Sequence, residues 1–265
     1  MIKLILTDLD GTFLNDQGDF DHELYRKVKQ LMDEKNIAFA PCTGKQCERV
    51  EKLFELEDAK NLWILGDSAT RIKHAGNYVY ESLLPNELGQ AILSKLSTVA
   101  IGATVIACTP SAAFVDANVS EKDMVAVRGS YQNVKIISDY QLITEDFVKI
   151  TVYDAQARCF ELVKELVEFK EKTYMVASEA SWIDISNQDV HKGSTVKKLQ
   201  TMLNVKKSET MAFGDGLNDR ELLEEARYSF AVSNAFAETK NKAKYIIGTN
   251  NDSAVLHTIT DFLQA

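Results

Sequence analysis

Proline is scarce in this sequence of 265 residues, which has three prolines and no stretch rich in both glycine and serine. We therefore expect no flexible linker between parts of the chain. No apolar run approaches the roughly 18 residues of a membrane-spanning helix, so neither a membrane span nor a membrane partner is expected. The apolar run near Met1 ends at Asp8 and is too short for a secretory signal, which favours a cytoplasmic protein.

Cysteine is also sparse, and its pattern argues against two common roles. The four cysteines are Cys42, Cys47, Cys108 and Cys159, and no two of them form a C-x-x-C pair. Metal-binding and redox motifs usually contain such pairs. We therefore expect reduced thiols that pack as small hydrophobic side chains.

Basic residues are fewer than acidic ones. Lysine plus arginine is 30, aspartate plus glutamate is 39, and the formal net charge is -9. Because a net negative field repels phosphate backbones, no nucleic-acid partner is expected, although a local basic pocket can still bind a small anion. A chain of this length can bury a sizeable core, either as one large domain or as two modest ones.

Apolar runs and helical periodicities alternate in both outer parts of the sequence. The expected strands lie at residues 2–7, 37–42, 62–65, 210–213, 228–232 and 245–247. Amphipathic helices are expected between them, one of which starts near His191. Strands that alternate with helices form a parallel sheet with right-handed crossovers. The pattern predicts an α/β fold with a doubly wound, mainly parallel, Rossmann-like core.

The middle of the sequence has a different pattern. The expected elements are a helix at residues 85–98, strands at 104–107, 113–115 and 148–153, and a hairpin of 175–178 with 182–185. Consecutive strands with helices beside them are typical of an α+β arrangement. We therefore predict an inserted α+β domain at residues 84–185. Residues 1–83 and 186–265 would form one discontinuous α/β core.

Two acidic motifs directly follow expected strands: DLDGT at residues 8–12 and GDGLND at residues 214–219. Ligands of open α/β sheets bind beyond the carboxyl ends of the strands, so the acids of both motifs are expected to meet at one sheet edge. These acids are Asp8, Asp10, Asp215 and Asp219. Crowded carboxylates raise one another's pKa or recruit a cation, and open sites with oxygen ligands favour Mg²⁺. Taken singly, each motif could instead be an acidic turn or a helix cap.

Two further features could bind an anion. Thr43-Gly44 follows the second expected strand, where a hydroxyl and main-chain N–H groups could form an anion cradle. Lys192 is placed at the start of a helix, where a cation is unfavourable with the helix dipole. We therefore expect an anion beside Lys192, either a carboxylate of the site or a phosphate. Taken alone, the dipeptide could be a plain turn, and Lys192 and Lys45 could be solvated surface lysines.

The order of these motifs resembles that of the haloacid dehalogenase-like phosphatase superfamily. DLDGT, Thr43-Gly44, Lys192 and GDGLND follow one another as in that superfamily. The large insert between Thr43-Gly44 and Lys192 is similar to the αβ cap (C2B) of the Cof-type branch, subclass IIB. Residues 182–199 resemble the segment of that branch that re-enters the core. The resemblance implies the same fold and a cap that determines substrate specificity.

The sequence departs from the Cof-type pattern at two places. Lys45 stands where arginine usually follows Thr-Gly, and Asp67-Ser68-Ala69 stands where Asn-Gly-Ala is usual. Arginine and lysine differ in how they bind phosphate, and Asp67 adds a negative charge near a site for anions. Both departures bear on the substrate range and leave the reaction type unchanged.

The resemblance implies a Mg²⁺-dependent phosphatase that acts on a small phosphorylated metabolite through an aspartyl-phosphate. Asp8 would be the nucleophile, and Asp10 would act first as general acid and then as general base. The metal would be held by the Asp8 side chain, the Asp10 carbonyl and Asp215, with Asp219 acting through a water molecule or by orienting Lys192. The groups around the phosphoryl oxygens would be Lys192, Thr43, Asn218 and the main-chain N–H groups of Leu9 and Gly44.

Two other functions are compatible with the same residues. A phosphomutase or another phosphotransferase would use the same Asp8 and Asp10 but pass the phosphoryl group to a sugar hydroxyl. A non-enzymatic phosphoacceptor or ligand-sensing protein also carries acids, a threonine and a lysine at strand ends. Receiver domains of that kind lack a cap, and a built-in acid–base such as Asp10 would shorten the life of a phosphorylated state.

The substrate class is open among the metabolites on which Cof-type relatives act. These are sugar phosphates, flavin mononucleotide, pyridoxal phosphate and nucleotides. Candidate contacts with the leaving group lie in cap loops at residues 116–123 and 128–132. The sequence carries no prediction of the oligomeric state.

Overall fold

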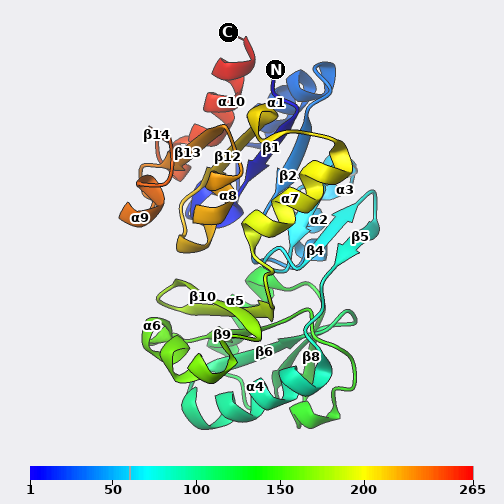
Figure 1. Cartoon of the computed structure of the whole chain (residues 1–265), viewed down its shortest axis with the longest axis vertical. Helices are drawn as coiled ribbons and strands as arrows, with labels where there is room; N and C mark the ends of the chain where they lie inside the picture. The colour runs from blue at the N-terminus through cyan, green and yellow to red at the C-terminus, as the bar shows by residue number, and fades with distance from the viewer. Residues whose placement is uncertain (60, 265) are drawn as a thin grey trace.

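A five-stranded parallel sheet forms the upper half of the molecule in Figure 1. The computed structural model describes residues 1–59 and 61–264. In this sheet the strand order is β14-β13-β12-β1-β2, and every neighbouring pair is parallel. The strands are β1 (Leu4–Thr7), β2 (Ala38–Pro41), β12 (Thr210–Gly214), β13 (Tyr228–Val232) and β14 (Tyr245–Ile247). The predicted parallel core sheet is therefore confirmed, and we call this half of the molecule the core.

Helices cover both faces of the core sheet. One face packs against α1 (His22–Glu34), α2 (Cys47–Leu53) and α10 (Ala254–Gln264), and the other packs against α7 (Lys192–Leu203) and α8 (Arg220–Glu224). The short helices are α3 (Glu55–Ala59) and α9 (Ala237–Lys240). This two-sided arrangement is the doubly wound α/β fold that the alternating pattern predicted.

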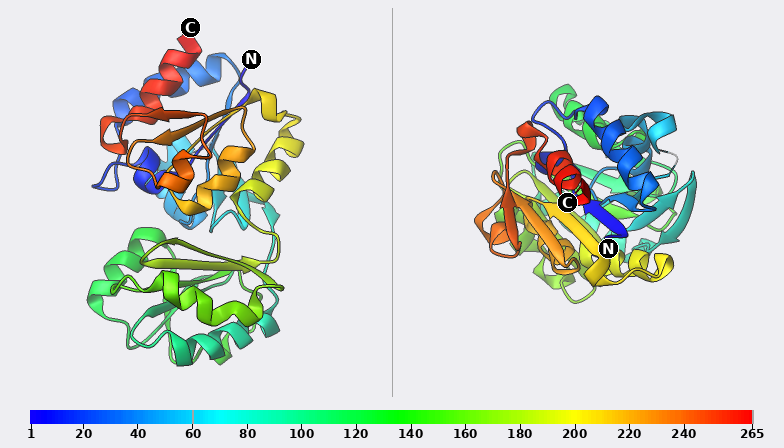
Figure 2. Two further views of the ribbon diagram at one scale, coloured as in Figure 1. Left: turned by 60° about the vertical axis from the view of Figure 1, so that its left-hand side comes forward. Right: turned by 90° about the horizontal axis from the view of Figure 1, so that it is seen from above.

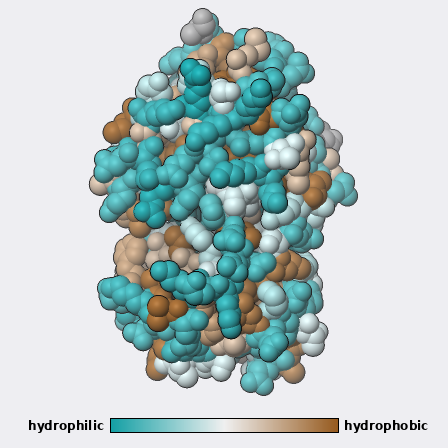
Figure 3. Space-filling model, in the orientation of Figure 1, coloured by the Kyte–Doolittle hydropathy of each residue, from teal (hydrophilic) through white to brown (hydrophobic). Residues whose placement is uncertain are grey.

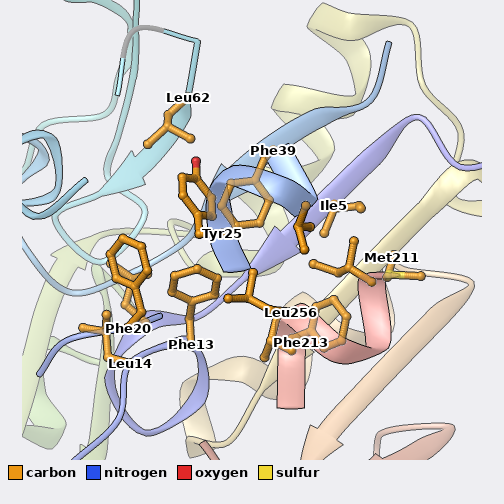
Figure 4. Close-up of a cluster of buried hydrophobic side chains, with 14 of the residues drawn as sticks. Ile5, Phe13, Leu14, Phe20, Tyr25, Phe39, Leu62, Met211, Phe213 and Leu256 are labelled. Carbon is orange, nitrogen blue, oxygen red and sulfur yellow. The ribbon is translucent and has the colours of Figure 1, made fainter. Parts of the chain in front are cut away.

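The alternation of side chains along β1 explains how both faces become buried. Ile5 joins the aromatic cluster shown in Figure 4, whereas Leu4 and Leu6 join the cluster beneath α7 and α8. Phe13 lies in the same aromatic cluster, with its ring centroid 5.8 Å from that of Phe39. Because Phe13 ends the turn that carries the first acidic motif, the cluster anchors that turn to the core.

The third expected strand does not continue the parallel sheet. β3 (Trp63–Gly66) touches the β2 side of that sheet through one parallel bridge, from Leu65 to Cys42. It then forms an antiparallel three-stranded sheet with β4 (Arg71–His74) and β5 (Asn77–Glu81). The sequence analysis missed this hairpin, because β4 alternates apolar with charged residues and was not recognised as a buried strand.

A six-stranded sheet forms the lower half of the molecule, which we call the cap (Figure 1). Its strand order is β10-β11-β9-β6-β7-β8, antiparallel except for the parallel pair β7-β8. The strands are β6 (Thr104–Cys108), β7 (Ala113–Asp116), β8 (Val134–Ile137), β9 (Lys149–Tyr153), β10 (Thr173–Glu179) and β11 (Trp182–Asn187). The helices are α4 (Asn86–Val99), α5 (Glu121–Ser130) and α6 (Cys159–Leu162). The α+β character expected for this part is confirmed, whereas the boundaries at residues 84 and 185 stay a prediction.

The cap sheet turns an apolar face away from the core and a polar face toward it. On β9, Ile150 and Val152 pack with α4 and α6 in one hydrophobic cluster. Lys149 and Thr151 alternate with them and line the cavity between the two halves. The left view of Figure 2 shows the cap sheet below the core, on the side where the turns after β1 and β12 lie. The fold thus brings polar cap residues against the expected site.

The face of the molecule that is seen in Figure 3 is mostly polar. Figure 3 shows hydrophilic side chains over most of one face, with hydrophobic atoms in separate patches. Within residues 1–59 and 61–264, no helix combines the length and the apolar character that a bilayer crossing requires.

Candidate active site

Parallel pairing of β1 with β12 brings the two acidic motifs together. The N–H of Asp8 donates to the carbonyl of Phe213 at 3.0 Å. The chain then turns through Leu9–Phe13, with Gly11 at a φ of 75°. A side chain at residue 11 would bring its Cβ to 2.6 Å from Oδ2 of Asp215, so this close approach requires glycine.

Three carboxylates and one ammonium group meet at this edge of the core sheet. One oxygen each from Asp8, Asp215 and Asp219 lie within 4.8 Å of one another. Lys192, the first residue of α7, donates through Nζ to Oδ1 of Asp8 at 2.5 Å and to Oδ1 of Asp219 at 2.6 Å. Its side chain is only 3% exposed. The anion expected beside this lysine is therefore supplied by two carboxylates of the site.

Burial and mutual repulsion shift the pKa values of this cluster. Burial raises the pKa of Asp8 well above its usual value, and the neighbouring acids add to this effect against the opposing charge of Lys192. Burial and the charge of Asp219 raise the pKa of Asp215 to about 7. Burial alone would lower the pKa of Lys192, but Asp219 and Asp8 outweigh it and raise that pKa well above its usual value. One lysine therefore does not fully compensate two buried acids and one partly buried acid.

The second oxygen of Asp219 shapes the loop that follows β12. Oδ2 of Asp219 accepts the N–H of Asp215 at 3.0 Å and that of Gly216 at 2.9 Å. A Cβ added at Gly214 would lie 2.6 Å from the Cβ of Asp219, so the loop closes tightly on this buried acid. The side chain of Asp219 does not cap α8, which was the alternative interpretation of this residue.

Asp10 is the acid whose carboxylate lies outside the cluster. Its side chain is 60% exposed, and its Oδ1 pairs with Nζ of Lys45 at 2.9 Å. Lys45 also donates to the carbonyl of Gly129 in the cap at 3.2 Å. The expectation that four carboxylates crowd together is therefore corrected to three, because Lys45 holds the fourth toward the cap. Lys45 is itself largely buried, so its interpretation as a solvated surface lysine is wrong.

The Thr43-Gly44 turn follows β2 and faces the cap. Oγ1 of Thr43 accepts the N–H of Lys45 at 3.2 Å, and both Thr43 and Gly44 line the cavity between core and cap. Asn218 lines the same cavity from the second acidic motif. The side chain of Leu9 is buried in the aromatic cluster, so only its main chain is left to face a ligand.

A cavity of about 400 Å³ separates the carboxylate cluster from the cap. The cap residues that line it are Ala126, Gly129, Ser130, Tyr131, Lys149, Thr151, Ser178, Glu179, Trp182 and Asp184. Of the two cap loops expected to contribute, the one at residues 128–132 lines the cavity. None of the residues 116–123, all of which the structure describes, is among those that line it.

The sequence analysis predicted the cap strands at residues 148–153 and 182–185 but missed the polar side chains on them that face the site. Lys149 on β9 and Asp184 on β11 are both buried, and they form an ion pair of 2.9 Å. A signal is present in the sequence, since Asp184 lies between Ile183 and Ile185 in a strand-like run. A charged residue at every second position of an otherwise apolar strand indicates a polar face turned toward a ligand or toward another part of the fold.

The donor set of the cluster fits a metal ion. Asp8, Asp215 and Asp219 supply carboxylate oxygens, the ligands that hard divalent cations prefer. Oγ1 of Thr12 donates to Oδ1 of Asp215 at 2.6 Å and thereby orients that carboxylate. The pKa values of Asp8 and Asp215 are raised, as expected for carboxylates in a site that lacks positive charge. These residues could therefore bind a cation.

A doubly wound sheet, an acidic cluster at its carboxyl edge and a cap over that cluster define a class of hydrolases. The sequence profile of the haloacid dehalogenase-like hydrolase family matches residues 5–259, and the chain belongs to this family.

Related proteins agree with this assignment. The 5-amino-6-(5-phospho-D-ribitylamino)uracil phosphatase YbjI of Escherichia coli strain K12 is 27% identical over 264 residues, which are 99% of this chain and 97% of that protein. The solved structure of SMU.1108c from Streptococcus mutans UA159 superimposes with a TM-score of 0.94 at 25% identity and covers 100% of both chains. The subclass IIB sugar phosphatase BT4131 shares the fold, with a TM-score of 0.83 at 17% identity over 98% of each chain. The chain is therefore an enzyme of the phosphatase class.

Proposed function

We propose that this enzyme hydrolyses phosphate monoesters of small metabolites with the aid of Mg²⁺, and that Asp8 carries the phosphoryl group between two steps. The main support is the setting of Asp8, a buried carboxylate at the end of β1 that lines the cavity. Lys192 holds Oδ1 of Asp8, which leaves Oδ2 as the attacking atom. Covalent catalysis of this kind divides one difficult displacement into two easier ones.

Asp10 would transfer the protons of both steps. In the first step, Oδ2 of Asp8 bonds to phosphorus, the bond from phosphorus to the leaving oxygen breaks, and Asp10 gives its proton to that oxygen. In the second step, Asp10 takes a proton from water, whose oxygen attacks phosphorus and releases Asp8 and inorganic phosphate. The carboxylate of Asp10 is exposed on the cavity wall, where it can exchange protons with substrate and water. A carboxylate inside the acidic cluster would be less accessible.

The phosphoryl oxygens would be surrounded by donors from three parts of the core. They are the ammonium group of Lys192, the side chains of Thr43 and Asn218, and the main-chain N–H groups of Leu9 and Gly44. Phosphoryl transfer depends mostly on positioning and charge neutralisation, so each of these donors contributes to the rate.

Mg²⁺ would be held by the side chains of Asp8 and Asp215 and by the main-chain carbonyl of Asp10. When bound, it supplies positive charge that neutralises the phosphoryl oxygens. Asp219 would support the site indirectly, because its two oxygens hold Lys192 and the loop that carries Asp215.

The substrates would be small phosphorylated molecules such as sugar phosphates, flavin mononucleotide, pyridoxal phosphate or nucleotides. A cavity of about 400 Å³ is within the usual range for small ligands. Cap residues surround it with both polar and aromatic groups, among them Thr151, Glu179 and Trp182. The Escherichia coli relative is named for a phosphorylated ribitylamino-uracil, a compound of this class.

The proposal is tested with Asp8→Asn and a panel of phosphorylated metabolites. We expect the wild-type protein to release inorganic phosphate with Mg²⁺ and without any added acceptor, which distinguishes hydrolysis from phosphoryl transfer to a sugar. EDTA should abolish turnover and added Mg²⁺ should restore it. Asp8→Asn should lower kcat by at least about 10³-fold, because the nucleophile is lost.

Asp154→Asn provides the matched control. Asp154 is also a buried aspartate in an ion pair, 2.7 Å from Arg158, but it lies in the cap and outside the cavity. This variant should lose stability and keep its kcat. Turnover that persists in Asp8→Asn, or full activity of the wild-type protein in EDTA, would contradict the proposal.

A further inference from the structure

Three consecutive residues after β3 have a left-handed backbone. The φ angles are 54° at Asp67, 59° at Ser68 and 63° at Ala69. Glycine and asparagine tolerate this conformation much better than serine does. A serine in such a position is strained, and strain of this kind persists where the surrounding structure holds the residue in place. The contacts of the Ser68 side chain are therefore expected to hold the residue in this conformation.

The hydroxyl of Ser68 binds a buried ammonium group from the cap. Nζ of Lys149 donates to Oγ of Ser68, to the carbonyl of Gly44 and to Oδ1 of Asp184, each at 2.9 Å. Lys149 is 1% exposed, and these three bonds use all three of its protons. Its charge is therefore committed to one cap acid and two core oxygens, and it is not left free for a leaving group.

Of the two core partners of Lys149, one belongs to the turn at Thr43-Gly44 and the other is hydrogen-bonded to it. Lys149 contacts the carbonyl of Gly44 directly. Ser68 is tied to the same turn, because its N–H donates to the carbonyl of Thr43 at 3.0 Å. On the cap side, Asp184 also accepts the hydroxyl of Thr151 at 2.8 Å, which fixes it on the polar face of the cap sheet. A single ammonium group thus connects the cap sheet to the turn that would bind phosphate.

We propose that Ser68, Lys149 and Asp184 form a positioning site, in which the seated cap holds the Thr43-Gly44 turn in the geometry that binds the phosphoryl group. The inference rests on the proposed function and deepens it. These residues do not touch the leaving group in this role, so their effect is the same for every substrate. The strained backbone at Ser68 is retained because the hydroxyl is needed there.

The test compares Ser68→Gly with Ser253→Gly. Ser253 also has a left-handed backbone, with a φ of 50°, but it lies at the start of α10 and outside the cavity. Glycine relieves the backbone strain at both positions, so the Tm of Ser253→Gly should be unchanged or slightly raised. Ser68→Gly also loses a hydrogen bond to the buried ammonium group of Lys149, so its Tm should fall. Only Ser68→Gly should lose function. Ser68→Ala keeps the strain and also removes the hydroxyl, so it should show the same functional loss and a lower Tm than Ser68→Gly.

Three functional measurements are made with Mg²⁺ present. They are kcat/KM for p-nitrophenyl phosphate, kcat/KM for glycerol 3-phosphate, and the affinity for inorganic phosphate by calorimetry. We expect about a tenfold loss in all three for Ser68→Gly and Ser68→Ala, because a hydrogen bond to a charged group is lost. Equal losses for the two esters distinguish positioning of the phosphate turn from contact with a leaving group.

The inference is overturned if Ser68→Gly changes stability but leaves the kinetics and the phosphate affinity unchanged, as a purely structural role predicts. It is also overturned if the two esters are affected differently while phosphate affinity is unchanged. Should Ser68→Gly fail to fold, Lys149→Met combined with Asp184→Asn removes the ammonium group without leaving a buried charge, and a larger uniform loss is expected. Phosphate affinity needs no turnover, so an inactive wild-type protein that binds phosphate would refute the proposed hydrolysis and still test this site.

Discussion

Replacing Asp215 by asparagine is expected to stabilise the metal-free protein while it abolishes activity. Burial and the charge of Asp219 raise the pKa of Asp215 from 3.8 to about 7. The folded state therefore favours the protonated form. The stability that this preference provides is fully present below pH 3.8 and is lost as the pH rises through about 7. Asparagine carries no charge at any of these pH values, so the variant avoids this loss.

The expected gain in the free energy of unfolding is only part of the energy that corresponds to the raised pKa of Asp215. A pKa raised from 3.8 to about 7 corresponds to about 4 kcal/mol, which is an upper bound because Asp215 is partly exposed. The amide oxygen also accepts the hydroxyl of Thr12 more weakly than the carboxylate does. We expect Asp215→Asn to exceed the wild type by about 2 kcal/mol near neutral pH and above. For a chain of this size, that corresponds to a Tm about 4–8 °C higher.

Thermal unfolding in EDTA at about pH 5 and about pH 8 measures this difference. The gap between Asp215→Asn and the wild type should be large at the higher pH and small at the lower one. If Asp215 binds Mg²⁺ as proposed, Mg²⁺ should raise the Tm of the wild type and have much less effect on the variant. A wild-type protein that is more stable than the variant in EDTA at the higher pH would refute the reasoning.

Asp184→Asn serves as the control, because its effect on stability should have the opposite sign to that of Asp215→Asn. Burial acts to raise the pKa of Asp184, but Lys149 and hydrogen bonds outweigh burial and lower that pKa below its usual value. Its stabilising effect is therefore present above the unfolded pKa and is lost as the pH falls. The control variant should have a lower Tm than the wild type at about pH 8, since Lys149 is left buried without its partner.

Two further variants test the site and the cap separately. Lys192→Met should lower kcat in the phosphate-release assay by about 100-fold to 1,000-fold, because it removes the ammonium group held by Asp8 and Asp219; an unchanged kcat would exclude Lys192 from the reaction. Gly89→Ala should lower the free energy of unfolding by about 2 kcal/mol in urea, because the added Cβ would overlap the ring of Phe147 in the cap. Gly129→Ala, whose Cβ would meet open space, should not show this loss.

Periodicity in the sequence predicts most of the core sheet. The expected ranges 228–232 and 245–247 coincide with β13 and β14, and the range 210–213 falls one residue short of β12. These strands are short apolar runs between turns, so local sequence contains enough information to find them. β4 was not found, because its charged residues are buried by distant partners: Lys73 pairs with Glu48 and Glu51 at 3.0 and 2.8 Å.

Local sequence also predicts where the acids of the site lie, but it does not predict where each side chain points. Asp8 and Asp215 could be placed at one sheet edge because each follows a strand of a parallel sheet. The direction of the Asp10 carboxylate depends on Lys45, which comes from another loop. Lys149 was missed for the same reason, because its partner Gly44 lies 105 residues away in the sequence.

Besides the bonds of Lys149, a second group of contacts seats the cap on the core and explains why the cap side chains beside it are hard to predict from sequence. On the core side they use side chains of one short segment, since Gln46 accepts the N–H groups of Gln132 and Asn133 at 2.8 and 3.0 Å, and Arg49 donates to the carbonyl of Gly129 at 3.1 Å. On the cap side they use main-chain atoms, which every residue except proline supplies in full. Cap side chains near these main-chain atoms can therefore change without loss of these contacts, whereas Lys149 and Asp184 both line the cavity and help to seat the cap. Gln46 and Arg49 thus hold the two halves together without constraining those cap side chains.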